Sequence, residues 1–185
     1  MSQFFQLHPV NPQERLVKQA VDLIRDGAVA VYPTDSAYAL GCHLGDKKAL
    51  DRLRRIRRVD DKHNFTLVCR DLSEIATYAR VSNTVYRLLH PKRRTIGIRV
   101  PDNKIVLALL EELGEPLLST TLILPGETLP MTDADEIRDR LQYDVDLIID
   151  GGHCGIEPTT VVSLVDDQPR VIRVGCGDPT PFQES

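Results

Sequence analysis

The stretch "VAVYPTDSAYALGC", Val29 to Cys42, decides the fold and raises the first functional question. The continuous apolar run over residues 28–32 is typical of a strand that is buried on both faces. It stops abruptly at Pro33–Ser36, where two hydroxyls and one carboxylate follow each other. Taken alone, this cluster favours a turn in which Asp35 or Ser36 caps local backbone N–H groups. The second interpretation is the floor of a binding site.

Strand and helix patterns alternate on both sides of this stretch. Asn11 and Pro12 predict the N-cap and first residue of a helix that ends at Gly27, and Asp46 predicts the start of another. Further helices are predicted over residues 82–90, 103–114 and 133–142, and further strands over residues 65–69, 95–100, 116–124 and 145–150. Two closing strands, 159–165 and 170–175, form a hairpin. The pattern predicts an α/β fold with flanking helices, whose sheet the hairpin makes mixed.

Length and composition narrow the class of protein. The chain has 185 residues, 42% of them hydrophobic, and a net charge of −4. This size predicts a single domain over residues 1–185, and the negative charge restricts any polyanion-binding surface to a local patch. Without a membrane-length apolar run or a signal-peptide pattern, we expect no membrane contact and a cytoplasmic location. The scattered cysteines predict free thiols of a reducing compartment: Cys42, Cys69, Cys154 and Cys176.

Hydroxyls, glycines and arginines recur where the predicted strands end. In open α/β sheets, ligands bind outside the carboxyl ends of the strands. Hydroxyls and glycine N–H groups bind anionic oxygens, and arginine pairs with phosphate or carboxylate in a fixed fork. The pattern therefore favours a nucleotide or an acidic metabolite, although each residue alone also fits a turn, a strand or a surface ion pair. The residues are Thr34, Ser36, Arg99, Ser119, Thr120, Thr121, Gly151, Gly152, Thr159, Thr160, Arg173 and Gly175.

The main basic cluster lies over residues 52–58, which contain five arginines, followed by Lys62 and His63. It fits a solvated helix face, a phosphate clamp at a helix end or a patch for an RNA backbone. Aromatic residues do not interleave with it, which argues against a base-stacking surface. The histidine spacings predict neither a zinc site nor a Ser-His-Asp arrangement, so no metal site is predicted. Without a Walker loop or a G-x-G-x-x-G motif, ATP would need another binding device.

With these residues assembled, the chain resembles the YrdC-like threonylcarbamoyl-AMP synthase family, and most closely its YciO-type branch. The stretch "YPTDSAYALGC" is similar to the family motif YPTDTvYGLGC. In the same order, "TIGIRVP" resembles the iRiP strand, "IIDGG…PTTVV" the D-G-G…P-S-T-V element, and "VIRVG" the closing ilR-G motif. The resemblance covers nearly the whole chain.

The resemblance implies a large twisted sheet with a concave basic cavity that takes L-threonine, bicarbonate and ATP. ATP is a substrate, and Mg²⁺ is a candidate companion ion. A threonine carbamate attacks the α-phosphate, giving threonylcarbamoyl-adenylate and pyrophosphate for the threonylcarbamoyladenosine modification of tRNA. Such chemistry needs positioning and charge stabilisation rather than a covalent nucleophile.

The resemblance also implies roles for single residues. Thr34 matches the threonine that contacts the amino-acid substrate. Arg57 falls at the lysine of the family's K-x-R motif and would contact phosphate. Three residues would hold the nucleotide: Thr121, at the serine of S-A-N, Thr159, at the serine of S-T-V, and Arg173, in the closing motif. Arg99 matches the arginine of iRiP, where a structural role is equally open.

Several positions depart from the family pattern. Val59 stands where K-x-R has its arginine, which removes one guanidinium from the phosphate clamp. Ile123 replaces the asparagine of S-A-N, and Ser36 and Ala39 replace a threonine and a glycine of the first motif. These changes bear on ATP handling and fit a paralogue with altered chemistry. The alternative function is a non-synthase module that binds double-stranded RNA, tRNA or the ribosome.

The chain also passes directly from Leu89 to Lys92, where the family has a P-G-P-x-T turn and a strand. Losing a sheet strand would expose two edges. We therefore expect a segment of the natural protein to be missing from the sequence at this point.

Overall fold

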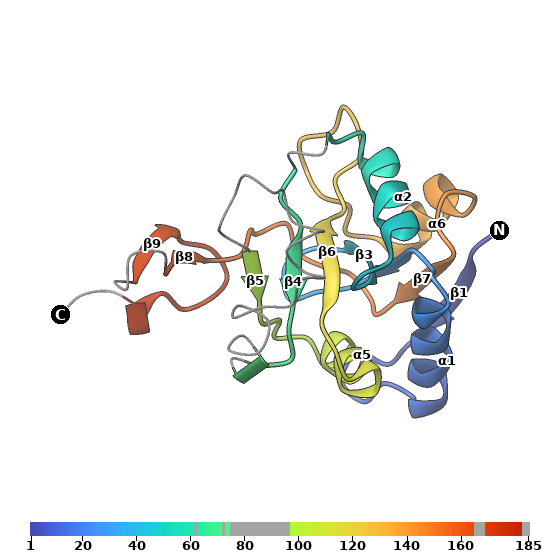
Figure 1. Cartoon of the computed structure of the whole chain (residues 1–185), viewed down its shortest axis with the longest axis horizontal. Helices are drawn as coiled ribbons and strands as arrows, with labels where there is room; N and C mark the ends of the chain where they lie inside the picture. The colour runs from blue at the N-terminus through green and yellow to red at the C-terminus, as the bar shows by residue number, and fades with distance from the viewer. Residues whose placement is uncertain (61–62, 72, 75–96, 165–168, 183–185) are drawn as a thin grey trace.

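The computed structural model describes residues 1–60, 63–71, 73–74, 97–164 and 169–182. The predicted helix over residues 82–90 and the predicted gap between Leu89 and Lys92 lie outside these residues. Seven strands form the main sheet in the order β1-β7-β2-β3-β6-β4-β5 (Figure 1). They are β1 (Gln3–Gln6), β2 (Ala30–Tyr32), β3 (Ala39–His43), β4 (Thr66–Val68), β5 (Gly97–Arg99), β6 (Leu117–Thr121) and β7 (Leu147–Asp150).

The mixed α/β sheet is confirmed, but the predicted reason for its mixing was wrong. The closing strands β8 (Val161–Ser163) and β9 (Arg170–Arg173) do pair antiparallel, yet they form a separate two-stranded sheet. Strand direction changes inside the main sheet instead, because β3 pairs antiparallel with both β2 and β6, and β6 with β4. The other neighbours are parallel: β1 with β7, β2 with β7, and β4 with β5.

In the described part of the chain, four α-helices begin and end largely where their capping residues predict. They are α1 (Glu14–Arg25), α2 (Lys47–Arg57), α5 (Lys104–Leu113) and α6 (Ala134–Leu141), and a short 3₁₀ turn, η1 (Thr180–Phe182), follows near the C-terminus. Asp46 caps α2 by accepting from the backbone N of Ala49 at 2.9 Å, and Asn103 caps α5 in the same way. The predicted start of α1 was wrong. Asn11 donates its backbone N–H to His8 Nδ1, and the helix begins only at Glu14.

Helices cover both faces of the sheet, as Figure 1 shows, with α2 and α6 on one side and α1 and α5 on the other. Side chains alternate along β2, so its neighbours divide between two apolar clusters. Val31 lies in the cluster with Leu53 of α2, and Ala30 and Tyr32 lie in the cluster with Leu109 of α5. Strand β2 is fully buried, as its apolar run predicts.

The opening stretch is a strand, a turn and a second strand. Sequence patterns did not predict β3, which follows the polar turn and pairs back onto β2 with Ala30 opposite Gly41. The edge strand β1 was also missed. Strands β2 and β3 lie in the middle of the sheet. The turn that connects them is therefore held at a fixed place at the end of these two strands. The β8–β9 hairpin stands beyond β5, away from the helices (Figure 1).

We expect Leu53→Ala to lower the free energy of unfolding by about 2–5 kcal/mol, because it opens a cavity in the core beneath α2. Leu53 is fully buried against the sheet, whereas Arg55 on the same helix is exposed. Arg55→Ala is therefore the matched control and should change the free energy by less than about 0.5 kcal/mol. Urea denaturation measures both, and equal losses would contradict the packing described.

Candidate functional site

A cavity of about 440 Å³ lies over β4, β5 and β6 and is closed on its other side by the β8–β9 hairpin. Its polar lining comes from six separate parts of the chain, and includes Asp35, Thr66, Arg99, Ser119, Thr121, Thr159 and Arg173. The structure thus brings together four of the predicted site residues, namely Arg99, Thr121, Thr159 and Arg173. The overall basic character of this cavity stays a prediction, because Asp35 accompanies the two arginines.

Thr34 and Ser36 lie below this lining and are buried. The Thr34 hydroxyl donates to the carbonyl of Ala37 at 2.6 Å and accepts from the backbone N of Ser36 at 3.1 Å. The Ser36 hydroxyl donates to the carbonyl of Glu157, which ties the turn to the loop before β8. The opening stretch does form a turn, but Thr34 rather than Asp35 or Ser36 accepts the local backbone N–H. Asp35 of this turn lines the cavity, and a ligand at this place stays a prediction.

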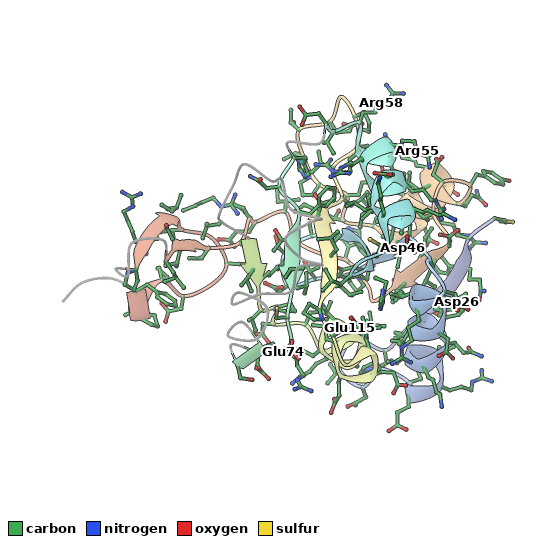
Figure 2. All side chains as sticks on the ribbon, in the orientation of Figure 1. Asp26, Asp46, Arg55, Arg58, Glu74 and Glu115 are labelled. Atoms are coloured by element: carbon green, nitrogen blue, oxygen red, sulfur yellow. The ribbon has the colours of Figure 1, made fainter. Side chains whose placement is uncertain are left out.

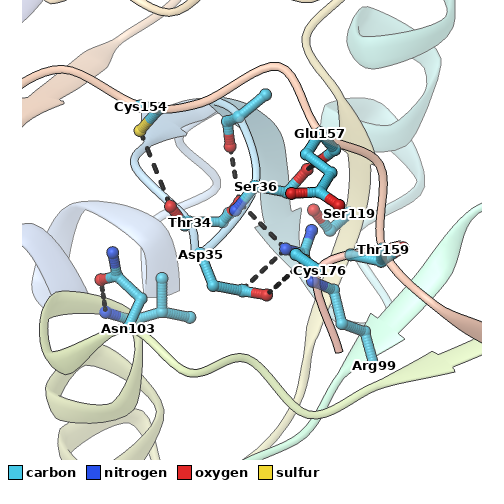
Figure 3. Close-up of polar contacts among 12 residues, drawn as sticks. Thr34, Asp35, Ser36, Arg99, Asn103, Ser119, Cys154, Glu157, Thr159 and Cys176 are labelled. Atoms are coloured by element: carbon cyan, nitrogen blue, oxygen red, sulfur yellow. Dashed lines mark hydrogen bonds and ion pairs between the residues drawn. The ribbon is translucent and has the colours of Figure 1, made fainter. Parts of the chain in front are cut away.

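Arg99 at the end of β5 reaches across to this turn. Its Nη2 donates to Thr34 Oγ1 at 3.0 Å and to Asp35 Oδ1 at 2.7 Å (Figure 3). The two side chains of this ion pair are only 18% and 20% exposed, so solvent screens their attraction less than at an open surface. Arg99 Nε is buried without a hydrogen-bond partner in the described part of the chain. Arg99 thus lines the cavity while its Nε stays buried and unpaired.

Arg173 lines the opposite wall and is held in a similar way. Its Nε donates to the carbonyl of Thr159 at 2.9 Å, and its Nη2 donates to Thr159 Oγ1 at 3.2 Å. The neighbouring Thr160 accepts from the backbone N of Gly175 at 2.9 Å, which fixes the end of β9. Each of the two cavity arginines is thus oriented by a threonine hydroxyl.

Ser119 lines the cavity. It also belongs to a hydrogen-bond chain that the sequence patterns did not reveal. The hydroxyl of Tyr32 donates to Ser119 Oγ at 2.6 Å, and Ser119 donates to the carbonyl of Leu40 at 3.1 Å. Burial raises the pKa of Tyr32 to about 12, so this phenol stays a neutral donor at physiological pH. Gly41 leaves room for the ring, since a Cβ there would lie 2.7 Å from Tyr32 Cε1.

Arg57, predicted to contact phosphate, lies outside the cavity lining. It stands at the end of α2 near His63, whose Nε2 lies 3.0 Å from Thr120 Oγ1. Burial, together with the charges of Arg57 and Arg54, lowers the pKa of His63, and the charge of Asp60 opposes the shift. Burial also lowers the pKa of Arg57, whose Nε has no hydrogen-bond partner in the described residues. Sequence spacing gave no signal for His63, because its partner lies 57 residues away.

Within the described residues, the cysteines provide no thiolate at this site, and the acidic side chains provide no metal centre. All four cysteines are free thiols. Two of them flank the polar turn, with Cys154 Sγ 3.7 Å from the carbonyl of Thr34 and Cys176 Sγ 3.8 Å from Asp35 Oδ2, and burial raises the pKa of both. In the described ranges, His, Cys, Asp and Glu side chains form no cluster that could hold a metal ion.

None of the helices in the described residues has the length and apolar character needed to cross a membrane. The predicted cytoplasmic location stays a prediction.

Comparison with known proteins gives a consistent picture. Residues 22–91 and 81–175 match the family described as telomere recombination, Sua5_yciO_yrdC. The Escherichia coli K12 protein YciO is 53% identical over 205 aligned positions, which cover 98% of this chain and all of that protein. The crystal structure of E. coli YciO superposes with a TM-score of 0.87, covering 99% of this chain and all of that one.

More distant relatives carry functional names. A threonylcarbamoyl-AMP synthase of Vibrio vulnificus YJ016 is 25% identical over 160 residues, 73% of this chain and 86% of that protein. P. abyssi Sua5 in complex with L-threonine shares the fold at a TM-score of 0.79 and 21% identity, covering 94% of this chain and 58% of that one.

We expect the free energy of unfolding to fall as the pH drops below about 6.5, because the pKa of His63 is lowered in the fold. The unfolded state takes up the proton first, so the contribution of neutral His63 is complete above the unfolded pKa. It is lost as the pH falls through the lower, folded pKa. Urea denaturation between about pH 5 and pH 8 measures this slope.

The variant His63→Gln should flatten that pH dependence, whereas the control His153→Gln, at a histidine that is 72% exposed, should preserve it. A slope unchanged in His63→Gln would contradict the assignment.

Proposed function

The chain belongs to the Sua5–YciO–YrdC family, and from this premise we propose that it makes threonylcarbamoyl-adenylate from L-threonine, bicarbonate and ATP. The observation that carries the proposal is the pair of threonine-held guanidinium groups, Arg99 and Arg173, on two walls of one cavity. Arginine binds carboxylate and phosphate through directed, charge-assisted hydrogen bonds. A ligand that carries both a carboxylate and a phosphate could pair with both guanidinium groups.

In this reaction only the substrates form and break bonds, so no side chain is needed as a nucleophile. The threonine amine attacks bicarbonate and releases water, which gives a carbamate. A carbamate oxygen then attacks the α-phosphorus of ATP, a P–O bond forms, and the bond to pyrophosphate breaks. Charge develops on the phosphate oxygens, so oriented N–H donors are the main contribution a protein can make. Cys154 and Cys176, with raised pKa values, are not needed as nucleophiles.

The cavity has limited means to hold Mg²⁺ by itself. Asp35 supplies a carboxylate, and its Oδ1 already pairs with Arg99. Mg²⁺ binds ATP enzymes largely through substrate phosphates and water, with one or two carboxylates. In this protein the ion would therefore enter with the triphosphate, and Arg99 and Arg173 would supply the remaining positive charge.

The departures from the family pattern have local structural reasons. Arg58 closes α2 in a left-handed conformation with φ of 49°, and Val59 then packs against the apolar core beneath that helix. Where the family pattern has an arginine that would contact phosphate, Val59 packs against the core instead. Arg57 at the adjacent helix end lies outside the cavity lining, so the phosphate contact that the family resemblance implies for it has no support from the cavity.

The alternative function, an RNA- or ribosome-binding module, would rest on the arginines of α2. Several of these charges are already used inside the fold, since Arg52 pairs with Asp146 at 2.6 Å and Arg54 with Asp51 at 3.1 Å. Arg55 and Arg58 remain exposed near the end of the helix (Figure 2). Affinity for RNA depends on the number of phosphates that basic side chains neutralise, and it falls steeply with salt. Two exposed arginines therefore make only a weak RNA-binding patch. The cavity is the better-supported site.

We expect the purified protein to release pyrophosphate from ATP only when L-threonine and bicarbonate are both present. Arg173→Gln should lower kcat/KM for ATP by about 10- to 100-fold, because it removes a charge-assisted hydrogen bond to the nucleotide. The product should be detected as the adenylate by mass spectrometry.

Arg170→Gln is the matched control, since Arg170 lies on the same strand but is exposed and outside the cavity lining. Its activity should equal that of the natural protein. Salt-sensitive RNA binding by a protein that shows no pyrophosphate release would favour the alternative instead.

A further inference from the structure

Thr66, the first residue of β4, carries a hydroxyl that the fold leaves free inside the cavity. The side chain lines the cavity and is partly buried. Among the described residues, Thr66 Oγ1 makes no hydrogen bond. A threonine hydroxyl has one proton to donate and two lone pairs to accept. This whole capacity is therefore available to a ligand.

The hydroxyl beside it on the sheet is committed within the fold. Ser119 of β6 lies directly opposite Thr66 in the strand register. Ser119 Oγ accepts from the hydroxyl of Tyr32 and donates its own proton to the carbonyl of Leu40. Of these two neighbouring hydroxyls in the cavity lining, only Thr66 has a proton to offer.

Gly97 keeps the space on the other side of Thr66 open. The two residues are register partners in the parallel strands β4 and β5. A Cβ at Gly97 would lie 3.2 Å from Thr66 Oγ1, which is a tight contact. The hydroxyl therefore points toward β5, at a position where that strand has no side chain. A small ligand group has room beside it.

The position of Thr66 relative to the two cavity arginines indicates which part of a ligand it meets. Thr66 lies on the sheet, whereas Arg99 reaches from β5 toward the polar turn and Arg173 belongs to the β8–β9 hairpin on the other side of the cavity. A ligand that pairs with both guanidinium groups crosses the cavity, and its middle passes over the sheet. In threonylcarbamoyl-adenylate, the group derived from bicarbonate joins the amino acid to the phosphate and forms this middle part.

The hydrogen-bonding pattern of bicarbonate also fits a hydroxyl. Bicarbonate has an O–H donor as well as acceptor oxygens, whereas the threonine carboxylate and the α-phosphate of ATP present acceptors only. Arginine donates and cannot accept, and a threonine hydroxyl does both. Thr66 therefore complements bicarbonate in a way that the two guanidinium groups do not.

We propose that Thr66 binds bicarbonate and the carbamate formed from it. The proposal rests on the proposed function, which supplies the identity of the substrate. In this step the amine nitrogen of threonine bonds to the bicarbonate carbon, and the C–OH bond breaks. The departing hydroxide leaves as water with one proton from the amine. Thr66 keeps its own proton and donates a hydrogen bond to an oxygen on which charge develops.

The experiment measures pyrophosphate release while bicarbonate, L-threonine or ATP is varied and the other two are saturating. Thr66→Val keeps the shape of the side chain and removes the hydroxyl. It should raise KM for bicarbonate by about 3- to 10-fold, the loss expected for one neutral hydrogen bond, and change KM for L-threonine and ATP by less than about twofold. Thr66→Ser should restore KM for bicarbonate. The matched control Thr128→Val, at an exposed threonine outside the cavity lining, should leave all three values unchanged.

Carbon NMR of isotope-labelled bicarbonate, with L-threonine and ADP present, decides the question if the natural protein shows no turnover. The natural protein and Thr66→Ser should broaden the bicarbonate signal, and Thr66→Val should broaden it much less. This result without turnover would refute only the synthase. Equal broadening in Thr66→Val, or none in the natural protein, would overturn the role of Thr66.

With turnover, two kinetic results would overturn the inference and leave the synthase intact. They are an unchanged KM for bicarbonate in Thr66→Val, and a defect that falls on L-threonine or ATP instead. Thermal unfolding confirms that each variant is folded. Thr66→Ala, which also lacks the hydroxyl, takes the place of Thr66→Val if that variant does not fold.

Discussion

Complete burial of β2 on both faces is the constraint on which the site depends. A strand buried on both faces can carry a polar group only where a buried partner pairs it, as Ser119 pairs the hydroxyl of Tyr32. Charged side chains are therefore found only beyond the end of the strand, beginning with Asp35 in the turn. Because β3 returns directly alongside β2, this turn cannot move away from the sheet. The buried strand thus fixes the position of the residues that orient Arg99.

Much of the fold could be predicted because its signals are local. Asp46 and Asn103 begin helices through their own side chains, and the apolar run before Pro33 marks a buried strand. The strands β1 and β3 were missed because their sequences lack a clear alternation of polar and apolar residues. Asn11 failed as a cap because the helix begins three residues later, at Glu14, with Gln13 at the N-cap position.

The candidate site was harder to predict because its contacts join distant parts of the chain. Strand ends and motif order pointed to Thr121, Thr159, Arg173 and Arg99, and the structure brings these four to one cavity. The link between Tyr32 and Ser119 spans 87 residues, and no local pattern marks it. A local pattern can identify a hydroxyl, but it cannot say which partner takes its proton.

Strand alternation also divides the polar residues of β6 between the two faces of the sheet. Ser119 shares a face with Tyr32, whereas Thr120 meets His63 on the side of α2. The cavity lining nevertheless includes Thr120 together with Ser119 and Arg99. Thr120 therefore connects this cavity to His63 at the end of α2.

The direction of each hydroxyl decides what the cavity can offer a ligand. Thr34 gives its proton to Ala37, Ser119 to Leu40 and Ser36 to Glu157, in each case to a backbone carbonyl. These three side chains therefore cannot donate to an anion without breaking a bond within the fold. The guanidinium groups of Arg99 and Arg173, which threonines hold in place, are the cationic donors of this cavity lining. In this cavity, buried hydroxyls of the sequence motifs form the framework, and the two arginines carry the positive charge.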